Sequence, residues 1–370
     1  MARVAVIGGW APSLIKFRGP LLAAMVARGH DVIGMAADGD AVTRDRLAAL
    51  GVGFAPIELQ RAGLDPRADA KAIAGLVRSL RRLRPDVVLG YTIKPVIYGS
   101  VAARLAGVPR RAAMITGMGS ALMGRATAKQ RLVAATARTL YRIGLAQCQT
   151  VIFQNTDDRD ELAPMIRRAT HVAVVRGSGV DLAHYARRDL PAGPPVFVFL
   201  GRLLRDKGIH EFVAAARQVK ARSPAARFRI AGWIDPNPES LGQSELDALI
   251  ADGTIEYVGA PDDVRPVLAA AHALVLPSYR EGTPRSVLEA MSMGRAVITT
   301  NAPGCRDTVV DGESGTLVPV RDAAALAAAM QALVDDPARL ARLAAAGHAR
   351  AVDLYDADRV AASVLDALGL

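Results

Sequence analysis

The sequence predicts an α/β protein made of two doubly wound domains, and three observations predict it. Short apolar runs alternate with segments long enough for a helix, which is the pattern of parallel βαβ units. A proline-rich joint at residues 190–195 interrupts this alternation, and the same pattern then starts again. The chain of 370 residues is also longer than one ordinary hydrophobic core accommodates.

Residues 1–185 are expected to form the first domain. Its first strand, residues 4–7, ends in Gly8-Gly9, and a helix is expected over 19–28. The chain begins with a strand, without the basic region and cleavage site of a signal peptide, and its two cysteines fit a reducing cytosol. The other apolar runs predict strands at 32–35, 87–89, 112–115, 151–154 and 172–175.

Residues 186–350 are expected to form the second domain. The alanine-rich end of the chain, about 351–370, predicts a helix that is a candidate to pack back on the first domain. No apolar run reaches the roughly 20 residues of a membrane-spanning helix. The two cysteines, Cys148 and Cys305, are too few for a disulfide framework or a cysteine zinc site. Strands are predicted at 196–200, 228–231, 254–258, 273–276 and 296–300.

The charge of the chain is uneven. Residues 1–185 carry 26 Lys and Arg against 13 Asp and Glu, whereas residues 186–370 carry 20 against 23. Residues 61–142 hold 16 basic and 3 acidic residues, which accounts for the whole excess of the first half. A basic half indicates nucleic acid, an anionic membrane surface or phosphorylated substrates as partners. Nucleic acid is disfavoured, because no aromatic cluster or nucleic-acid motif accompanies the charge.

The most informative stretch is VLPSYREGTPRSVLEAMSMGRAVITT, which begins at Val275. It predicts a strand, a helix over about 285–293 and a second strand, so the helix N-terminus lies at the carboxyl edge of a parallel sheet. Free N–H groups and the helix dipole favour phosphate there. Glu281 precedes the helix and Glu289 lies inside it, so one carboxylate can reach a sugar and the other a ribose. Alone, such a pair is usually a capping acid and a solvated acid.

A second motif, GRLLRDKG at residues 201–208, directly follows the strand at 196–200. Arg202 and Lys207 would stand at the carboxyl end of that strand, where doubly wound domains bind their ligands. A guanidinium and an ammonium together can hold a diphosphate and neutralise it as it leaves. The ordinary alternative is two solvated basic residues in a loop, and the neighbouring 281–289 motif favours the binding role.

Other motifs do not support a cofactor or a metal ion. The segment after the glycines at 8–9 is not GxGxxG, so a nicotinamide dinucleotide is not expected, and these glycines suit close approach of a substrate or phosphate. The DxD pairs at 38–40 and 356–358 are interpreted as turn and helix-surface acids. The six histidines show no metal-ligand spacing. No metal site is therefore expected.

The second half resembles the retaining glycosyltransferase family 4, which has the GT-B architecture of two Rossmann-like domains facing a central cleft. The resemblance covers most of residues 196–330, in FLGRLLRDKGIHEFVAAA, YVGAPDDV and the stretch from LPSYREGTPRSVLEAM to VVDGESGTLVPVRD. In the first half, YTIKPVIYGS, ITGMGS, FQNTDD and GSGVD resemble a narrower branch. That branch comprises bacterial enzymes that add a sugar to a polyprenyl-diphosphate-linked saccharide.

The resemblance implies roles for the matched residues of the second domain. Arg202 and Lys207 would clamp the diphosphate of the nucleotide sugar, and with Glu281, near the donor sugar hydroxyls, they form the expected catalytic group. Glu289 would bind the ribose of the nucleotide. The remaining donor contacts are expected from Gly282, Thr283, Pro284, Arg285, Ser286 and Val287.

The acceptor is expected to bind the first domain. Many relatives place a histidine or an aspartate of that domain near the transferred sugar, whereas this chain has TIKP, with Lys94, and no such residue is evident. The expected acceptor contacts are Gly9, Lys16, Arg18, Thr92, Lys94, Thr116 and Gly117.

Two basic helices are predicted in the first half, at 71–84 and 125–142. In residues 71–84 apolar side chains share one face, and Lys and Arg flank it. Either that face packs in the core and the basic side is solvated, or the helix lies on an anionic bilayer. The apolar, glycine-rich segment 112–124 between them is either core or a loop that touches a lipid tail.

Together these features predict a metal-independent, retaining hexosyltransferase. It would move an N-acetylhexosamine from a UDP-sugar to a polyprenyl-diphosphate-linked saccharide, as a peripheral protein on the cytoplasmic face of the cell membrane. The family resemblance implies that the leaving diphosphate takes the acceptor proton on the same face, without an enzymic nucleophile. A soluble acceptor is the alternative among enzymes. A non-catalytic protein that binds membrane or nucleic acid through its basic half is the alternative from another class.

Overall fold

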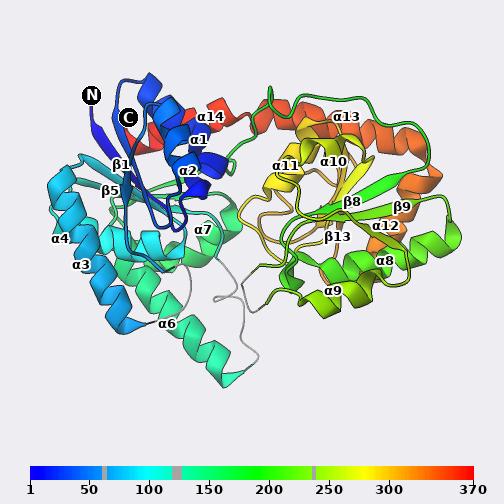
Figure 1. The fold of residues 1–370 in the computed structure, drawn as a ribbon, viewed down its shortest axis with the longest axis horizontal. Coiled ribbons are helices and arrows are strands. Elements are labelled where there is room, and N and C mark those ends of the chain that lie inside the picture. Colours follow the sequence, from blue (N-terminus) through cyan, green and yellow to red (C-terminus); the bar gives the residue numbers. More distant parts are fainter. Residues whose placement is uncertain (61–64, 119–126, 236–238) are drawn as a thin grey trace. The chain divides into compact units, whose positions relative to one another are not determined.

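The computed structural model describes residues 1–60, 65–118, 127–235 and 239–370. These residues form two compact units, Met1–Ser178 with Ala357–Leu370 and Gly179–Asp356. Each unit is built around one parallel sheet with helices packed on it (Figure 1), which confirms the predicted doubly wound α/β class. The chain changes unit after residues 178 and 356, so the expected boundaries at 185 and 350 both lie inside the second unit.

The first unit has a seven-stranded sheet in the order β3-β2-β1-β4-β5-β6-β7. The strand order reverses direction between the neighbours β1 and β4, which makes that position the topological switch point of the sheet. The strands are β1 (Arg3–Ile7), β2 (Asp31–Ala36), β3 (Gly53–Pro56), β4 (Val87–Tyr91), β5 (Arg110–Ile115), β6 (Thr150–Phe153) and β7 (His171–Val174).

Alternating side chains of these strands enter two different cores. Ala5 and Ile7 of β1 lie in a cluster with α3, α4 and α6, whereas Val4 and Val6 lie in a cluster with α1, α2 and α14. Successive strand residues point to opposite faces, so both faces of the sheet are covered by helices. The helices are α1 (Pro12–Ala27), α2 (Ala41–Ala49), α3 (Pro66–Leu83), α4 (Ser100–Leu105), α6 (Ala128–Leu145), α7 (Thr156–Leu162) and α14 (Ala357–Leu368).

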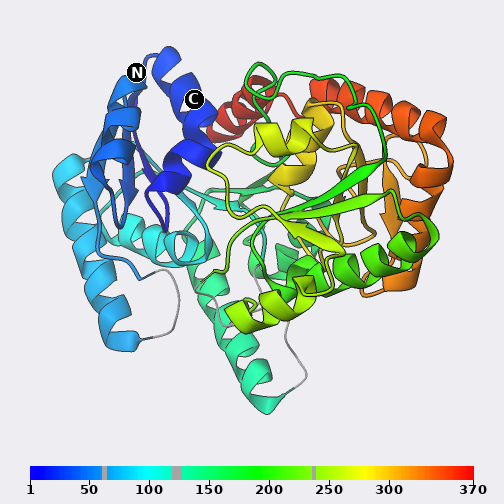
Figure 2. The same ribbon diagram turned by 45° about the vertical axis from the view of Figure 1, so that its right-hand side comes forward.

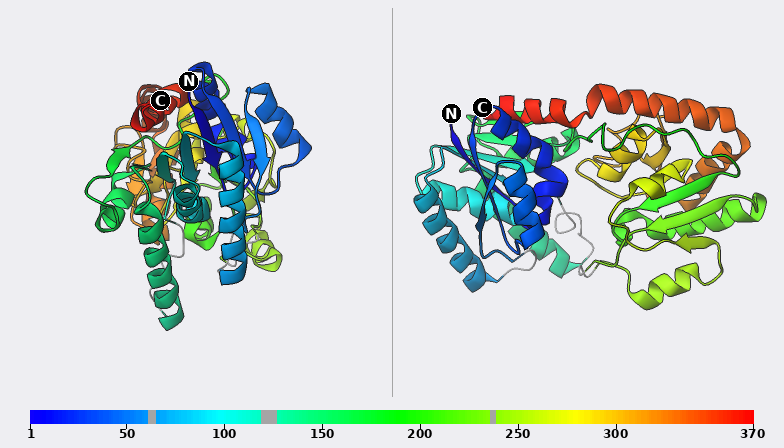
Figure 3. Two further views of the ribbon diagram at one scale, coloured as in Figure 1. Left: turned by 90° about the vertical axis from the view of Figure 1, so that its left-hand side faces the viewer. Right: turned by 45° about the horizontal axis from the view of Figure 1, so that its top comes forward.

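The start of one helix of this unit differs from the sequence-based expectation. Helix α1 begins at Pro12, and Pro20 lies inside it. The expected start at residue 19 was wrong, because Pro12 occupies the first turn and the helix continues through Pro20. At the other end of the chain, α14 packs along α1 (Figure 3), with Val364 and Leu365 buried.

The second unit has a six-stranded parallel sheet in the order β10-β9-β8-β11-β12-β13, with its switch point between β8 and β11. Strands β8, β11 and β12 have the predicted bounds. Strands β3 and β13 were not predicted, because GFAP contains Gly and Pro, which are rare in strands, and TLV has only three residues. The strands are β8 (Val196–Leu200), β9 (Arg227–Ala231), β10 (Ile255–Tyr257), β11 (Ala273–Leu276), β12 (Ala296–Thr300) and β13 (Thr316–Val318).

One continuous hydrophobic core joins this sheet to its helices. Helices α8 and α12 pack side by side (Figure 2), and α11 packs against α13. None of the described helices is long and apolar enough to cross a membrane. The helices are α8 (Ile209–Arg222), α9 (Gln243–Ile250), α10 (Arg265–Ala269), α11 (Arg285–Ser292), α12 (Ala323–Asp335) and α13 (Pro337–Leu354).

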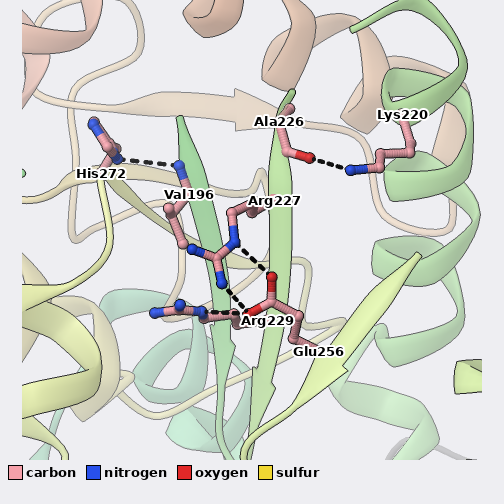
Figure 4. Close-up of polar contacts among 7 residues, drawn as sticks. All are labelled: Val196, Lys220, Ala226, Arg227, Arg229, Glu256 and His272. Carbon is pink, nitrogen blue, oxygen red and sulfur yellow. Dashed lines mark hydrogen bonds and ion pairs between the residues drawn. The ribbon is translucent and has the colours of Figure 1, made fainter. Parts of the chain in front are cut away.

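Polar contacts fix the starts of several strands in this unit (Figure 4). On edge strand β10, Glu256 accepts hydrogen bonds from Arg227 at 2.6 and 2.8 Å and from Arg229 at 2.9 Å, which pairs β10 with β9 through side chains. Before β11, Nδ1 of His272 accepts a hydrogen bond from the backbone N–H of Val196 at 3.1 Å. Burial lowers the pKa of His272 below its usual value of 6.5.

Candidate active site

The switch point of the second sheet brings two predicted motifs together. Arg202 and Lys207 follow β8, and the segment that contains Glu281 follows β11, which is the neighbour of β8. In open α/β sheets, ligands bind outside the carboxyl ends of the strands at such a point. The fold therefore puts both motifs at the edge where a ligand site is expected.

Lys207 and Glu281 are in direct contact. The Lys207 Nζ atom lies 2.5 Å from Oε1 of Glu281, and the two side chains are 13% and 16% exposed. The same oxygen accepts a hydrogen bond from the Ser278 hydroxyl at 2.9 Å. A buried ion pair needs such additional bonds, because removing both charges from water is costly. Ser278 was not predicted, although it stands in the same LPSYREG string.

Close backbone approaches hold the two loops together. The backbone N–H of Tyr279 donates to the Asp206 carbonyl at 2.8 Å, and that of Glu281 donates to the Pro303 carbonyl at 3.0 Å. At Gly304, with φ of 75°, a Cβ atom would lie 2.2 Å from the carbonyl oxygen of Glu281. Only glycine fits there, so the sequence PGC after β12 fixes the place of the Glu281 loop.

Arg202 stands apart from the Lys207–Glu281 pair. Its guanidinium lies 3.5 Å from the carboxylate of Asp235, and the Arg202 side chain is 41% exposed. Asp235 was not predicted, because it follows β9 and carries no motif of its own. Asp206, which lies between Arg202 and Lys207 in the sequence, is a further acid that was not predicted. Burial raises its pKa, while the charge of Lys207 opposes that shift.

The residues between Glu281 and helix α11 are small and largely buried. Gly282 and Pro284 are buried, Thr283, Arg285 and Ser286 are half-buried, and α11 begins at Arg285 without a side-chain cap. Its N-terminal backbone and dipole therefore face the end of β11. The Val287 side chain is fully buried in the core, so only the backbone of this residue is left for a ligand.

Glu289 lies inside α11 and is 8% exposed. Its Oε1 atom accepts a hydrogen bond from Arg285 at 2.9 Å, one helical turn earlier. Burial raises the pKa of Glu289, and the positive charge of Arg285 and a hydrogen bond from Tyr185 act in the opposite direction. The two predicted glutamates therefore have separate sets of partners, Lys207 for the first and Arg285 for the second.

In the first unit, the residues predicted to bind the acceptor lie at the carboxyl edge of the sheet. Gly9 follows β1, Thr92 and Lys94 follow β4, and Thr116-Gly117 follows β5, and these three strands are neighbours. Thr92 has a left-handed φ of 68°, which is uncommon for a β-branched residue. A Cβ atom at Gly9 would lie 3.1 Å from the Thr92 hydroxyl oxygen. The predicted segment 112–124 is partly outside the described residues.

Lys94 is buried in a charge network that the sequence did not predict. Its Nζ atom lies 2.8 Å from Oδ1 of Asp69, and the Tyr98 hydroxyl donates to Oδ2 of Asp69 at 2.9 Å. Asp69 stands in the first turn of α3, and a π-helical turn, Pro95–Gly99, carries Tyr98. Such turns are frequent at functional sites.

The two other predicted cations differ in exposure. Arg18 is 4% exposed, lies 4.9 Å from the centre of the Tyr91 ring and donates to the Ser178 hydroxyl at 3.0 Å. Lys16 is exposed, with its Nζ atom 5.8 Å from the centre of the Trp10 ring.

The described residues contain no group of three or more His, Cys, Asp or Glu side chains arranged to hold a metal ion. Asp40, the second acid of the first DxD pair, caps α2 by accepting a hydrogen bond from the Thr43 backbone at 2.7 Å.

Comparison with known proteins agrees with this architecture. Residues 18–177 match the model of the glycosyl transferase 4-like domain, and residues 194–336 match that of the glycosyl transferases group 1. The structure of HepE from Anabaena in complex with UDP and glucose superposes with a TM-score of 0.80 at 16% identity, over 100% of both chains.

Two curated relatives differ in their acceptors. The N,N'-diacetylbacillosaminyl-diphospho-undecaprenol alpha-1,3-N-acetylgalactosaminyltransferase of Campylobacter jejuni is 26% identical over 347 residues, 90% of each chain. The 2-deoxystreptamine N-acetyl-D-glucosaminyltransferase of Streptomyces fradiae is 33% identical over 244 residues, 63% of this chain and 57% of that one.

Two Rossmann-like units, each with a parallel sheet and a switch-point edge, form the GT-B fold. The first half matches the glycosyl transferase 4-like domain and the second half the group 1 domain, so the protein is a glycosyltransferase built from these two domains.

Proposed function

We propose that the protein is a retaining, metal-independent hexosyltransferase of glycosyltransferase family 4. It moves an N-acetylhexosamine from a UDP-sugar to a polyprenyl-diphosphate-linked saccharide. The observation that carries the proposal is the Lys207–Glu281 contact at the β8/β11 switch point, next to the N-terminus of α11. A cation, an acid and a helix dipole at one sheet edge suit a sugar that is joined to a diphosphate.

In this reaction the bond from the sugar C1 atom to the diphosphate oxygen breaks, and a bond from C1 to the acceptor oxygen forms on the same face. The acceptor proton passes to the departing diphosphate oxygen. Lys207 and Arg202 stabilise the charge that develops on the diphosphate. Glu281 binds hydroxyls of the donor sugar and Glu289 those of the ribose, which aligns C1 with the acceptor.

The names of similar proteins support the choice of substrates. The structure of HepE holds UDP and glucose, which favours a UDP-sugar as donor. Both curated relatives named above transfer an N-acetylhexosamine. The Campylobacter relative, which matches nearly the full length of the chain, uses a saccharide linked to undecaprenyl diphosphate.

A two-stage experiment tests this function. UDP-, GDP- and ADP-sugars are screened by thermal shift, and the stabilising donor is then offered with polyprenyl-diphosphate-linked monosaccharides. We expect a UDP-N-acetylhexosamine to raise the melting temperature and to yield a product with the donor's anomeric configuration by NMR. Absence of stabilisation by every donor would remove the enzyme assignment, and an inverted product would remove retention.

We propose that the protein attaches to the inner face of the cell membrane, and its basic first half supports this proposal. Leu76 and Leu80 of α3 are buried in the first unit, while Arg78, Arg81 and Arg82 are exposed. The apolar side of α3 therefore serves the core, and contact with lipid is electrostatic, worth roughly 1 kcal/mol for each basic residue near an anionic surface.

Vesicle sedimentation tests this attachment. The protein should sediment with anionic vesicles at low salt, release as salt rises, and ignore neutral vesicles. Replacing Arg78, Arg81 and Arg82 by serine should reduce sedimentation and leave donor stabilisation unchanged. If the wild-type protein ignores anionic vesicles at low salt, the basic side of α3 is only solvated and the membrane location is wrong.

A soluble acceptor is the second candidate, favoured by the 33% identity to the 2-deoxystreptamine transferase. Offered in parallel, 2-deoxystreptamine separates the two candidates. Transfer to this aminocyclitol, with none to any lipid-linked saccharide, would establish the second candidate in place of the first.

A further inference from the structure

Ser278 lies just beyond the end of β11 in the second unit, and it is fully buried. Its hydroxyl donates to Oε1 of Glu281 at 2.9 Å, and the Lys207 Nζ atom lies 2.5 Å from the same oxygen. Two donors of different kinds therefore converge on one oxygen of this carboxylate. One is a cation from the loop after β8, and the other is a neutral hydroxyl from the loop after β11.

The backbone at Ser278 is fixed by contacts that do not involve its hydroxyl. The hydroxyl of Thr300, a buried residue of β12, donates to the Ser278 carbonyl. On the side of β8, a Cβ atom at Gly208 would lie 2.2 Å from the carbonyl oxygen of Pro277, so the two loops meet backbone to backbone. Neighbouring elements therefore set the position from which the Ser278 hydroxyl reaches Glu281.

A carboxylate that distinguishes sugar hydroxyls needs a defined rotation. The last torsion of a glutamate side chain is broad, so an ion pair alone leaves the plane of the carboxyl group loosely defined. The ammonium of Lys207 is a point charge on a long stem, whereas the Ser278 hydroxyl donates from a short side chain on a fixed backbone. A serine also adds this bond without a second positive charge, which would compete with Lys207 for the diphosphate.

We infer that Ser278 is a positioning residue for recognition of the donor sugar, which orients the Glu281 carboxylate toward the sugar hydroxyls. The inference rests on the proposed function, in which Glu281 binds those hydroxyls. It extends the donor site to the beginning of the loop after β11. The ligand group concerned is the hexose of a nucleotide sugar, and the serine acts on it only through the carboxylate.

Turnover of deoxy analogues of the donor tests this role. The wild-type protein is offered UDP-N-acetylhexosamines that lack the 3-, 4- or 6-hydroxyl, and slower release of UDP identifies the hydroxyls that the site recognises. Ser278→Ala should slow turnover of the complete donor by about three- to tenfold, because a hydrogen bond to a charged group is lost. Removal of the hydroxyl that Glu281 binds should then slow the variant about threefold less than it slows the wild type, because the two changes affect one contact. UDP affinity, measured by calorimetry, should be unchanged, because UDP carries no hexose.

The matched control is Ser292→Ala, which removes another buried serine hydroxyl of the same unit, one that donates to the Tyr185 carbonyl at 2.8 Å. It should leave turnover and the ranking of the analogues unchanged. Ser278→Cys keeps a weak donor and is the second variant, which should show a smaller change in the same direction as Ser278→Ala.

The outcomes separate this inference from the proposed function. If each missing hydroxyl slows Ser278→Ala as much as it slows the wild type, or if the variant binds UDP more weakly, Ser278 only supports the fold. The inference is then overturned and the proposed function stands. A wild-type protein that is slowed by none of the missing hydroxyls would also overturn the inference. If the wild type binds no UDP, GDP or ADP, the proposed function itself fails, and the inference fails with it.

Discussion

Removing the ammonium of Lys207 tests the centre of the candidate site. Lys207→Met keeps most of the aliphatic stem and removes the charge. In the structure this ammonium is 13% exposed and lies 2.5 Å from Glu281, so little water is available to replace it. A charge-assisted hydrogen bond to the departing diphosphate contributes about 1.5–3 kcal/mol, so turnover should fall roughly tenfold to a hundredfold.

The same substitution also affects stability. Glu281 keeps its bond from Ser278 but loses its cation, which should lower the free energy of unfolding by about 1–3 kcal/mol. Turnover must therefore be measured at saturating donor and well below the melting temperature. Circular dichroism and urea unfolding establish that the variant is folded under the assay conditions.

Arg205→Met is the matched control for Lys207. Arg205 is 45% exposed, stands two positions away and pairs with Glu245, outside the candidate site. This variant should retain wild-type turnover. A folded Lys207→Met protein whose turnover is within threefold of wild type would refute the assignment of Lys207 to the diphosphate.

Three further predictions concern metal, pH and the first unit. Turnover should survive excess EDTA, and loss of turnover with rescue by Mg²⁺ or Mn²⁺ would contradict metal independence. Because the pKa of His272 is lowered in the folded protein, the unfolded chain binds a proton more readily, and the folded state loses stability as pH falls below about 6.5. His272→Asn should therefore flatten the fall in melting temperature between pH 7.5 and 5.5. An unchanged slope would contradict this. Asp69→Leu and Lys94→Met should each lower the free energy of unfolding, measured in urea, by about 3–5 kcal/mol. The double variant should recover most of this loss, and additive losses would show that the two residues are not coupled.

The sequence predicts the strands that are both apolar and flanked by clear breaks. VFVFL, ALVL and AVITT follow the proline joint, a histidine and Gly294-Arg295 respectively, and the structure has these strands with the predicted bounds. Strand β13, with three residues, carries no measurable period, and only its pairing with β12 defines it. Tertiary pairing, not local pattern, therefore decides an edge strand as short as β13.

The residues of the candidate site also divide into those that the sequence predicts and those that it does not. Lys207 and Glu281 were expected in one site because both follow strands that a doubly wound sheet places side by side. Ser278 and Asp235 were not expected, since their contacts depend on the local path of loops that contain no periodic pattern. Sequence motifs thus point to candidate residues for the chemistry, whereas the neighbours of those residues appear only once the loops are placed.

The pairing of the cations implies different roles for Arg202 and Lys207. Because Lys207 lies against a carboxylate, its field is largely cancelled beyond the site, and it adds little to the attraction of a distant anion. Arg202 is 41% exposed and its carboxylate partner is 3.5 Å away, so its charge reaches solvent and can attract the diphosphate before contact. Arg202→Met should therefore raise the KM for the donor, with a marked dependence on salt. Lys207→Met should lower kcat with little dependence on salt. Equal changes in KM and kcat for the two variants would show that the two cations act as one clamp.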